Sequence, residues 1–570
     1  MNKKTTKWLS MLLACGMVFS TAACGKTGGN ESGGSGPNEL GLNVPTGGDP
    51  DSTDTLDVYL LLHGYGQDWL ISGLNRFAKE DWVKAKYPKL SINYTFDSKD
   101  STAHQKLSQG ASINKFDILF SVNMQGYEST GVAADLTDLV YLAEVPGETG
   151  TRVIDKIPQY CLNSVRNATA EDRADGNDTY NVVSYIQSFW SMMYNADILK
   201  QLQKEVPVTT DEFLELGDYI ATNGYTDATG ATNKNVIVNR AAANYWRSSY
   251  DLWWSQYEGE EGVLNYYEGY DPVEEQTNSN AVLKQQGRLE SLKVVESILT
   301  RYRYPKTDED FKVVQSAFLM GDGVFHYNGD YFACEMQTEI SELKNNYNID
   351  YDIQYMKMPV ISAIVNKTPS VKTVAETKGI TADEMLQSII REIDANKAYA
   401  DTQAKVDGVS EADFAIIAGA RSYAGLSQAS SLTAVIPSYA AGKNIAADFL
   451  RFMYTEESIK DFTISSGGLM IPSTYDIVND AELYSKIQPI HKSKIQLMRG
   501  TSNYPFTYSY SANATRLGKG GLESLYYKGK FEVNFALDED DRETAEDILK
   551  NEADHWNKNT WDQMVAAAGA

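Results

Sequence analysis

The feature that most restricts the fold is an alternation of strand-like and helix-like segments early in the chain. Five such segments follow one another: residues 56–62, 70–86, 89–96, 102–113 and 116–122. The first, third and fifth are short apolar or alternating runs typical of strands, whereas the other two have helical spacing. This order is typical of an α/β fold with a mostly parallel sheet, whose ligands lie beyond the carboxyl ends of the strands. We expect the loops at 63–69 and 121–125 to share that rim.

Further along the chain, local signals place several other elements. Residues 209–212 and 381–384 are capping boxes that predict helix starts, the first helix running through Ile220. Residues 324–327 form a short apolar run between two glycines, which predicts a strand. No internal repeat or heptad array is present in the sequence.

Length and charge exclude some classes of protein. The chain has 570 residues, enough for two or three domains, and its hydrophobic fraction of 42% is typical of a globular protein. The formal charge of -26 disfavours binding to nucleic acid or to anionic membrane surfaces.

The first 23 residues have the order of a secretory signal. Three lysines precede an apolar run at 8–19, and small residues follow at 20–23. A run of twelve residues is too short for a permanent membrane span, and the alternative to a secretory signal is an ordinary buried helix. Removal of this segment, which carries three Lys and no acid, would change the formal charge from -26 to -29.

The end of that segment, Thr21-Ala22-Ala23-Cys24-Gly25, resembles the lipobox of bacterial lipoproteins. The resemblance implies acylation of Cys24, for example by palmitate. Leu12-Leu13-Ala14-Cys15 fits the motif's letters better, but cleavage there would leave a short apolar run, so we expect lipidation at Cys24. Residues 24–53 are Gly-rich and predict a flexible tether with a span of about 30 Å.

Residue types that support catalysis or metal binding do not cluster in this sequence. It lacks the common hydrolase, zinc-protease, phosphate-loop and dinucleotide motifs, and its five His are scattered singly. The acidic run 538–541 lacks calcium-loop spacing. We predict no enzyme activity, no cofactor and no metal site. Cys161 and Cys334 are either two buried thiols or one long-range disulfide.

Aromatic side chains instead stand beside amides and carboxylates in predicted loops. The aromatic groups are Tyr65 with Trp69, Trp190 with Tyr194, residues 245–254, Tyr327 with Tyr331, and residues 504–510. A sugar lays its C–H faces on aromatic rings and hydrogen-bonds through its hydroxyls to amides and carboxylates. These groups therefore favour a carbohydrate ligand.

The order of several segments resembles the family 1 extracellular solute-binding proteins, the sugar-capturing components of ABC importers. The matching segments are FDILFSVNMQGYESTGVAADLTDLV (116–140), YNVVSYIQSFWSMMYNADIL (180–199), VPVTTDEFLEL (206–216), AFLMGDGVFHYNGDYF (317–332), AADFLRFMYTEESIKDFTISSGGLMIP (446–472) and YSYSANATRL (508–517). Residues 329–331, Gly-Asp-Tyr, stand where the family has Gly-x-Trp, so a Tyr replaces the Trp there.

The resemblance implies a two-lobe, periplasmic-binding-protein-like fold of the class II type, which closes on its ligand about a hinge. It places one lobe at 54–184 plus 359–470 and the other at 185–358 plus 471–570. Within these bounds, residues 368–429 have the character of an insertion, with helices expected over 382–404 and from Ser410.

The resemblance also implies ligand contacts, residue by residue. These are Tyr65, Trp69, Asn123, Gln125, Gln187, Trp190, Trp253, Trp254, Asn328, Asp330, Tyr331, Tyr508 and Tyr510. Trp190, Tyr331 and Tyr510 are the residues we most expect to stack on a sugar.

The function implied is that of a monomeric, lipid-anchored receptor on the outer face of the cell membrane, from a Gram-positive bacterium. It would deliver a sugar, and for a body of this size an oligosaccharide, to the permease of an ABC transporter. The alternatives are a surface glycoside hydrolase, a receptor for another solute such as a peptide, and a binding subunit that signals to a membrane kinase. Hydrolysis would need two carboxylates about 5 to 9 Å apart, and no motif nominates such a pair.

Overall fold

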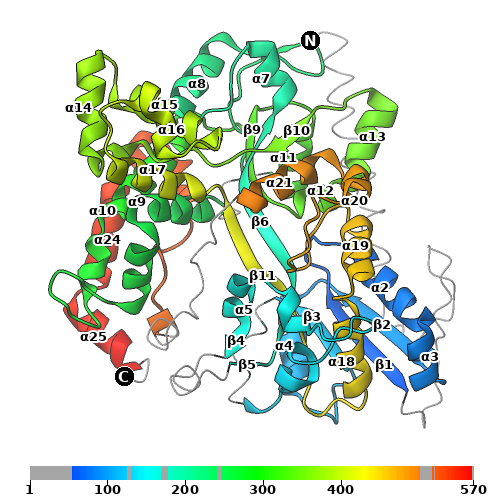
Figure 1. Cartoon of the computed structure of the whole chain (residues 1–570). Coiled ribbons are helices and arrows are strands. Elements are labelled where there is room, and N and C mark those ends of the chain that lie inside the picture. Colours follow the sequence, from blue (N-terminus) through cyan, green and yellow to red (C-terminus); the bar gives the residue numbers. More distant parts are fainter. Residues whose placement is uncertain are drawn as a thin grey trace.

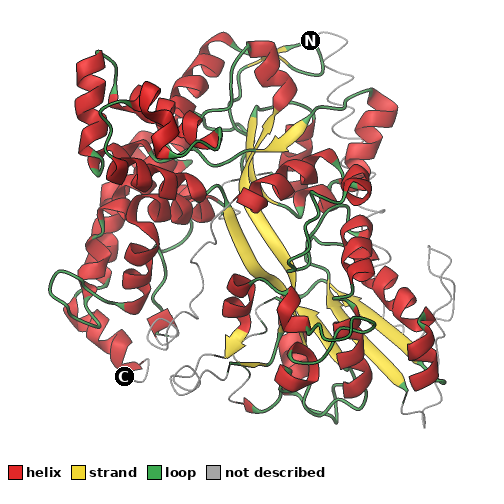
Figure 2. Ribbon diagram, in the orientation of Figure 1, coloured by secondary structure: helices red, strands yellow, loops and turns green. Residues whose placement is uncertain are grey.

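The computed structural model describes residues 54–122, 124, 127, 130–167, 178–240, 245–306, 309–500, 517–518 and 520–567. Side chains are not described at 100–101, 403–405, 427–430 and 499–500. Figure 1 shows the helices gathered at both ends of a long, continuous sheet, and Figure 2 shows its strands as one band running between them.

The predicted alternation of strands and helices at the start of the first lobe is confirmed. Its strands are β1 (Thr55–Leu61), β2 (Ser91–Asp97) and β3 (Ile118–Ser121), and β1 pairs in parallel with the other two. Both predicted intervening helices also form. The helix expected over 70–86 is interrupted at Glu80, whose extended backbone separates α2 (Asp68–Lys79) from α3 (Asp81–Lys86).

The first lobe is completed by segments from distant parts of the chain. Its other elements are α4 (Asp100–Ser108), α5 (Gln159–Val165), β4 (Arg166–Asn167), β5 (Thr179–Tyr180), α18 (Lys443–Phe452) and α19 (Glu456–Ser465). One apolar core includes side chains from residues 56–186 and 432–471. The chain therefore leaves this lobe and returns to it.

The connection between the lobes is made by two long antiparallel strands. β6 (Val183–Asn195) pairs with β11 (Leu426–Val435) along its first part and with β9 (Phe325–Gly329) and β10 (Ile353–Tyr355) along its second part. β11 also pairs with β3, so the seven strands form one mixed sheet that spans both lobes. A third crossing lies beside β6, where the Gln187 amide donates to the Met470 carbonyl oxygen at 3.0 Å.

Most of the remaining helices belong to the second lobe. They are α7 (Ala196–Leu202), α8 (Thr210–Asn223), α9 (Trp246–Glu268), α10 (Gln286–Arg301), α11 (Phe311–Leu319), α12 (Phe332–Glu335), α13 (Gln337–Tyr347), α14 (Pro369–Lys378), α15 (Ala382–Asp394), α16 (Tyr399–Val406), α17 (Glu411–Ser422), α20 (Ala481–Lys486), α21 (Pro489–Gly500), α23 (Phe531–Phe535), α24 (Ala545–His555) and α25 (Lys558–Ala567). A short hairpin joins β7 (Tyr225–Thr226) to β8 (Thr232–Asn233).

The assignment of residues 359 to about 425 to the first lobe is wrong. Their apolar side chains share a core with α8, α9 and α10 of the second lobe. Figure 1 also shows α14 to α17 beside these helices. Polar contacts fix them there, because Arg391 pairs with Glu212 at 2.6 Å and the Thr209 hydroxyl donates to Asp383 at 2.8 Å. The chain returns to the first lobe only through β11.

Local signals predicted helix starts well in this region. Thr381 and Glu384 form the expected reciprocal capping box at α15, and Ser410 caps α17. Thr209 caps α8, but Glu212 accepts from the Val208 amide at 2.7 Å rather than from the capping residue. The run expected to be helical over 382–404 is divided into α15 and α16.

Candidate functional site at the lobe junction

The two lobes touch where the β1–α2 loop of the first lobe meets α12 of the second. Gly64 in that loop has φ +73°, and a Cβ there would lie 2.8 Å from Glu335 Oε1 and 3.2 Å from Tyr331 Cβ. Glycine is therefore required at this position for its backbone conformation and for its size. A second contact joins the lobes nearby, where the Cys334 thiol donates to the Ser466 carbonyl oxygen at 3.4 Å.

Four aromatic side chains gather at this contact, and we call them the junction cluster: Tyr65, Trp190, Tyr245 and Tyr331. The ring centroids of Trp190 and Tyr331 are 5.2 Å apart, those of Trp190 and Tyr245 are 5.1 Å apart, and those of Tyr65 and Tyr331 are 6.1 Å apart. All three pairs meet edge to face, the arrangement that ring quadrupoles favour. Three of the predicted ligand residues are thus brought together from the first loop, the crossing strand β6 and the turn after β9.

The turn after β9 depends on its glycine for space. A Cβ on Gly329 would lie 2.6 Å from Tyr331 Cε1 and 2.9 Å from Trp190 Cε2. Because β9 pairs with β6 in this stretch, the register itself places Gly329 opposite Trp190. The Gly-Asp-Tyr sequence therefore lets the two rings approach each other.

The cluster has a covered part and an accessible part. Tyr65 and Tyr331 are 3% and 7% exposed, and burial holds the pKa of both hydroxyls well above the ordinary value. The Tyr65 hydroxyl lies 2.5 Å from the Ser431 hydroxyl on β11. Trp190 and Tyr245 are only half-buried. A ligand at the junction would therefore meet Trp190 and Tyr245 first.

Sequence reasoning missed two residues at this site. Tyr245 belongs to the aromatic run 245–254, and its selection from that run requires knowing how α9 begins. Glu335 follows Tyr331 by four residues, and its amide donates to the Tyr331 carbonyl oxygen at 2.9 Å. The i, i+4 spacing places both on one helical turn, yet no pattern in the sequence reveals which lobe that turn faces.

Trp69, Trp253 and Trp254 are corrections to the predicted ligand set. They are at most 1% exposed. Trp69 packs among Phe120, Tyr185 and Phe462 of the first-lobe core. The indole N–H groups of the other two donate within the second lobe, to the Pro359 carbonyl oxygen at 3.0 Å and to Gln285 Oε1 at 2.8 Å. All three tryptophans are core residues.

Asn328 and Asp330 are also corrections, because buried protein partners occupy their polar groups. Both are 0% exposed. Asp330 pairs with Lys494 at 3.0 Å and accepts from the Ser188 hydroxyl at 2.9 Å. The Asn328 side chain contacts His326 Nε2 at 3.0 Å and accepts from the Gly329 amide at 2.8 Å. These side chains stabilise the crossing strand and the turn beneath the cluster.

Lys494 also links that turn to the third crossing. Its ammonium group, itself 0% exposed, donates to the Gly468 carbonyl oxygen at 2.8 Å. A buried charge is tolerated when it is paired and hydrogen-bonded. The network therefore connects α21, β6 and the segment that returns from the first lobe.

The other predicted ligand residues have varied placements. Gln187 is 3% exposed on β6 and donates to the Tyr160 hydroxyl at 2.6 Å. Asn123, Gln125, Tyr508, Tyr510 and the lipidation residue Cys24 lie outside the described residues.

Cys161 and Cys334 are both free thiols, which decides between the two possibilities left by the sequence. Within the described ranges, no group of three or more His, Cys, Asp or Glu side chains could hold a metal ion. In the same ranges, no helix combines the length and apolar character needed to cross a membrane.

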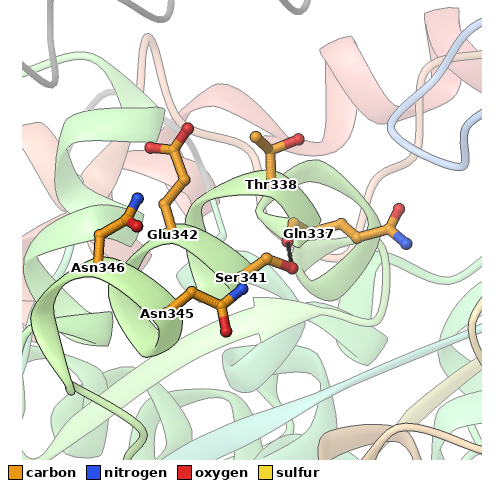
Figure 3. Close-up of a pocket in the computed structure, with 6 residues that line it drawn as sticks. All are labelled: Gln337, Thr338, Ser341, Glu342, Asn345 and Asn346. Atoms are coloured by element: carbon orange, nitrogen blue, oxygen red, sulfur yellow. Dashed lines mark hydrogen bonds between the residues drawn. The ribbon is translucent and has the colours of Figure 1, made fainter.

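A separate surface pocket lies along α13 and is shown in Figure 3. Its lining consists of Gln337, Thr338, Ser341, Glu342, Asn345 and Asn346. One polar helix face makes up this lining, without any ring or residue of the first lobe. The pocket therefore lacks the chemistry of the lobe junction.

Comparison with known proteins identifies the fold. No protein-family model matches the sequence, and no curated protein matches it. Among solved structures, a chitin oligosaccharide binding protein aligns over 90% of this chain and 98% of its own, with 13% identity and a TM-score of 0.53. A family 1 extracellular solute-binding protein from Bifidobacterium longum subsp. infantis aligns over 91% and 100%, with 15% identity and a TM-score of 0.47. The GacH receptor of Streptomyces glaucescens aligns over 90% and 98%, with 12% identity and a TM-score of 0.49. The first of these likenesses confirms the expected fold: this chain has the two-lobe α/β fold of a solute-binding protein.

Proposed function

We propose that this protein is an extracytoplasmic receptor that captures an oligosaccharide between its lobes and delivers it to the permease of an ABC transporter. The observation that carries the proposal is the junction cluster, whose half-buried rings lie near the Glu335 carboxyl group where the two lobes meet. Rings offer faces for sugar C–H groups, and the carboxylate offers acceptors for hydroxyls. The likeness in fold to a chitin oligosaccharide binding protein supports a ligand of this class.

Capture follows from contacts with both lobes. Tyr65 comes from the first lobe, Tyr331 from the second, and Trp190 from the strand that joins them. A ligand that touches both lobes in the closed arrangement, but only one in an open arrangement, favours closure by that difference in affinity. The permease would then distinguish loaded from empty receptor by its shape.

A thermal-shift screen tests the ligand class. The purified protein is heated with maltodextrins, xylo-oligosaccharides, chitin oligosaccharides and raffinose, and with a peptide mixture as the contrasting class. A ligand at one hundred times its Kd stabilises the native state by about 2.7 kcal/mol, which raises Tm measurably. We expect at least one oligosaccharide to raise Tm. A shift with peptides and none with any sugar would refute the proposed ligand class.

The proposal places the protein on the outer face of the membrane through an acylated Cys24, with residues 25–53 as a tether. Two acyl chains give stable anchoring at about 0.8 kcal/mol per buried CH₂. In a bacterial host that processes lipoproteins, Cys24→Ser should move the protein from the membrane fraction to the soluble fraction. Cys15→Ser is the matched control and should leave it in the membrane fraction. The opposite result would assign the anchor to Cys15.

A further inference from the structure

The acidic side chain of Glu335 lies near both the junction cluster and the first-lobe loop. It lies at the end of α12, one turn after Tyr331, and its Oε1 is 2.8 Å from the position that a Cβ on Gly64 would occupy. The carboxyl group therefore lies at the lobe junction, close enough to Tyr245 and Tyr331 that, besides burial, its charge raises the pKa of their hydroxyls.

The hydrogen bonding of this carboxyl group is incomplete. Gln315 Nε2 donates to Oε2 at 2.9 Å, whereas Oε1 accepts no hydrogen bond from any described residue. The side chain is half-buried, and its desolvation raises the pKa of Glu335 to about 7. A desolvated carboxylate without its full set of donors is costly, and such groups concentrate at functional sites. A ligand that supplied donors to Oε1 would remove part of that cost.

The groups around Glu335 leave its charge largely unneutralised. No described Lys or Arg forms an ion pair with it. The charged groups that act on Glu335 are Lys312 on α11 and Asp310, which caps that helix. Its other ionisable neighbours are Tyr245 and Tyr331 of the cluster and Cys334 on the same helix, with Asp68 acting on Cys334 and His63 lying against Tyr65. The hydroxyls of the two tyrosines stay protonated at neutral pH because burial raises the pKa of each.

We infer that Glu335 is the polar anchor of the ligand site, whose ionised carboxylate accepts hydrogen bonds from the hydroxyls of a neutral sugar stacked on Trp190 and Tyr245. This inference rests on the proposed function and deepens it. Neutral sugars carry many hydroxyl donors and no negative charge, so they suit an unpaired carboxylate. An acidic sugar would meet like-charge repulsion at the same place.

The direction in which sugar affinity changes with pH follows from the protonation state of Glu335 that binds the sugar. The ionised form of Glu335 accepts hydrogen bonds through both oxygens, so affinity should rise as pH rises through the pKa of about 7. If the sugar binds that form alone, lowering pH from 8 to 6 weakens binding roughly tenfold. Comparison with a variant that lacks the carboxyl group removes the contributions of all groups that the two proteins share.

Calorimetric titration at pH 6 and pH 8 tests this inference, with the sugar from the panel that raises Tm most. The proteins are wild type, Glu335→Gln and Glu339→Gln. Glu339 is the matched control, since it is a buried carboxyl on the neighbouring helix α13, accepts from the Ser316 hydroxyl at 2.6 Å, and also has a raised pKa. We expect Glu335→Gln to weaken binding roughly tenfold at pH 8 and to lose the pH dependence. Glu339→Gln should retain wild-type affinity and the wild-type pH profile.

These outcomes distinguish a failure of the role given to Glu335 from a failure of the proposed function. A wild-type protein that binds the sugar equally at pH 6 and pH 8 overturns the role of Glu335, and this holds even if Glu335→Gln folds poorly. Equal affinity of wild type and Glu335→Gln at pH 8 overturns it as well, while leaving sugar binding intact. If no sugar of the panel binds the wild type, the proposed function is wrong, and so is the role of Glu335 in binding a sugar.

Discussion

Trp190 occupies the central position among the aromatic side chains at the lobe junction. It lies on the strand that joins the lobes, and its ring meets both Tyr245 and Tyr331 edge to face. Its half-buried state leaves part of the ring accessible. Among the described tryptophans that the sequence nominated, Trp190 alone retains the exposure that stacking on a ligand requires.

Replacing Trp190 should therefore affect binding more than replacing a comparable tryptophan elsewhere. We expect Trp190→Ala to weaken oligosaccharide binding by about 2 kcal/mol, or roughly 30-fold in Kd, because a large stacking surface is removed. Trp82 is the matched control, since it is half-buried against Phe77 on the first lobe. Trp82→Ala should lower Tm and leave Kd unchanged in calorimetry. Equal losses of affinity in both variants would contradict the role assigned to Trp190.

Glu335 should also make the free energy of unfolding of the ligand-free protein depend on pH. Burial raises its pKa from 4.5 to about 7 in the folded protein. Protonated Glu335 is thus favoured by the folded state, and this contribution is present below pH 4.5 and lost as pH rises through 7. Relative to Glu335→Gln, the free energy of unfolding of the wild type should fall by up to about 3 kcal/mol between pH 4.5 and pH 8.

Denaturant unfolding of both proteins across that pH range measures the difference. Glu335→Gln serves as the reference for all other titrating groups, because they are common to the two proteins. A difference that stays constant with pH would show that the Glu335 carboxyl titrates normally.

At the scale of elements, the β1–α2 loop and α12 form the contact between lobes. Gly64 and Gly66 both have positive φ, at +73° and +69°, but a Cβ would collide with α12 only at Gly64. Gly64→Ala and Gly66→Ala should each lose about 1 kcal/mol of stability from backbone strain. Only Gly64→Ala should also weaken oligosaccharide binding, because it separates the loop from Tyr331 and Glu335.

Chemical denaturation and calorimetry on the two variants separate these effects. We expect both variants to lose unfolding free energy through backbone strain, Gly64→Ala somewhat more because of its collision with α12, and only Gly64→Ala to lose affinity. If Gly66→Ala weakens binding as much as Gly64→Ala does, the approach of the loop to α12 has no part in binding.

The sequence predicted elements better than it predicted contacts. The βα alternation, the caps at Thr209, Thr381 and Ser410, and the strand before Tyr331 depend on local patterns, and all of them form. The site was only partly predictable, because aromatic content does not tell a core ring from an accessible one. Trp253 and Trp254 face the interior of the second lobe for reasons of tertiary packing that no local pattern reports.

The error over residues 359 to about 425 has a similar cause. Capping signals predicted the starts of α15 and α17, but the choice of lobe depends on partners far away in the chain, such as Glu212 for Arg391. Glu335 cannot be selected from the sequence because its importance comes from the loop at Gly64, which is distant in sequence and adjacent in space.

At the scale of the whole molecule, one sheet extends through both lobes and three crossings join them. The buried Asp330–Lys494 pair holds two of those crossings together beneath the junction cluster. Trp190 therefore stands on one of the crossings and Tyr331 and Glu335 directly follow the turn that this network supports, while the β1–α2 loop approaches them from the first lobe.

Isothermal titration calorimetry of the purified wild-type protein with a panel of neutral oligosaccharides tests the central claim most directly. We predict saturable binding of at least one of them, with one site per chain and a free energy of about −8 kcal/mol for a micromolar Kd. Absence of heat with every neutral oligosaccharide, together with saturable binding of a peptide, would contradict the account.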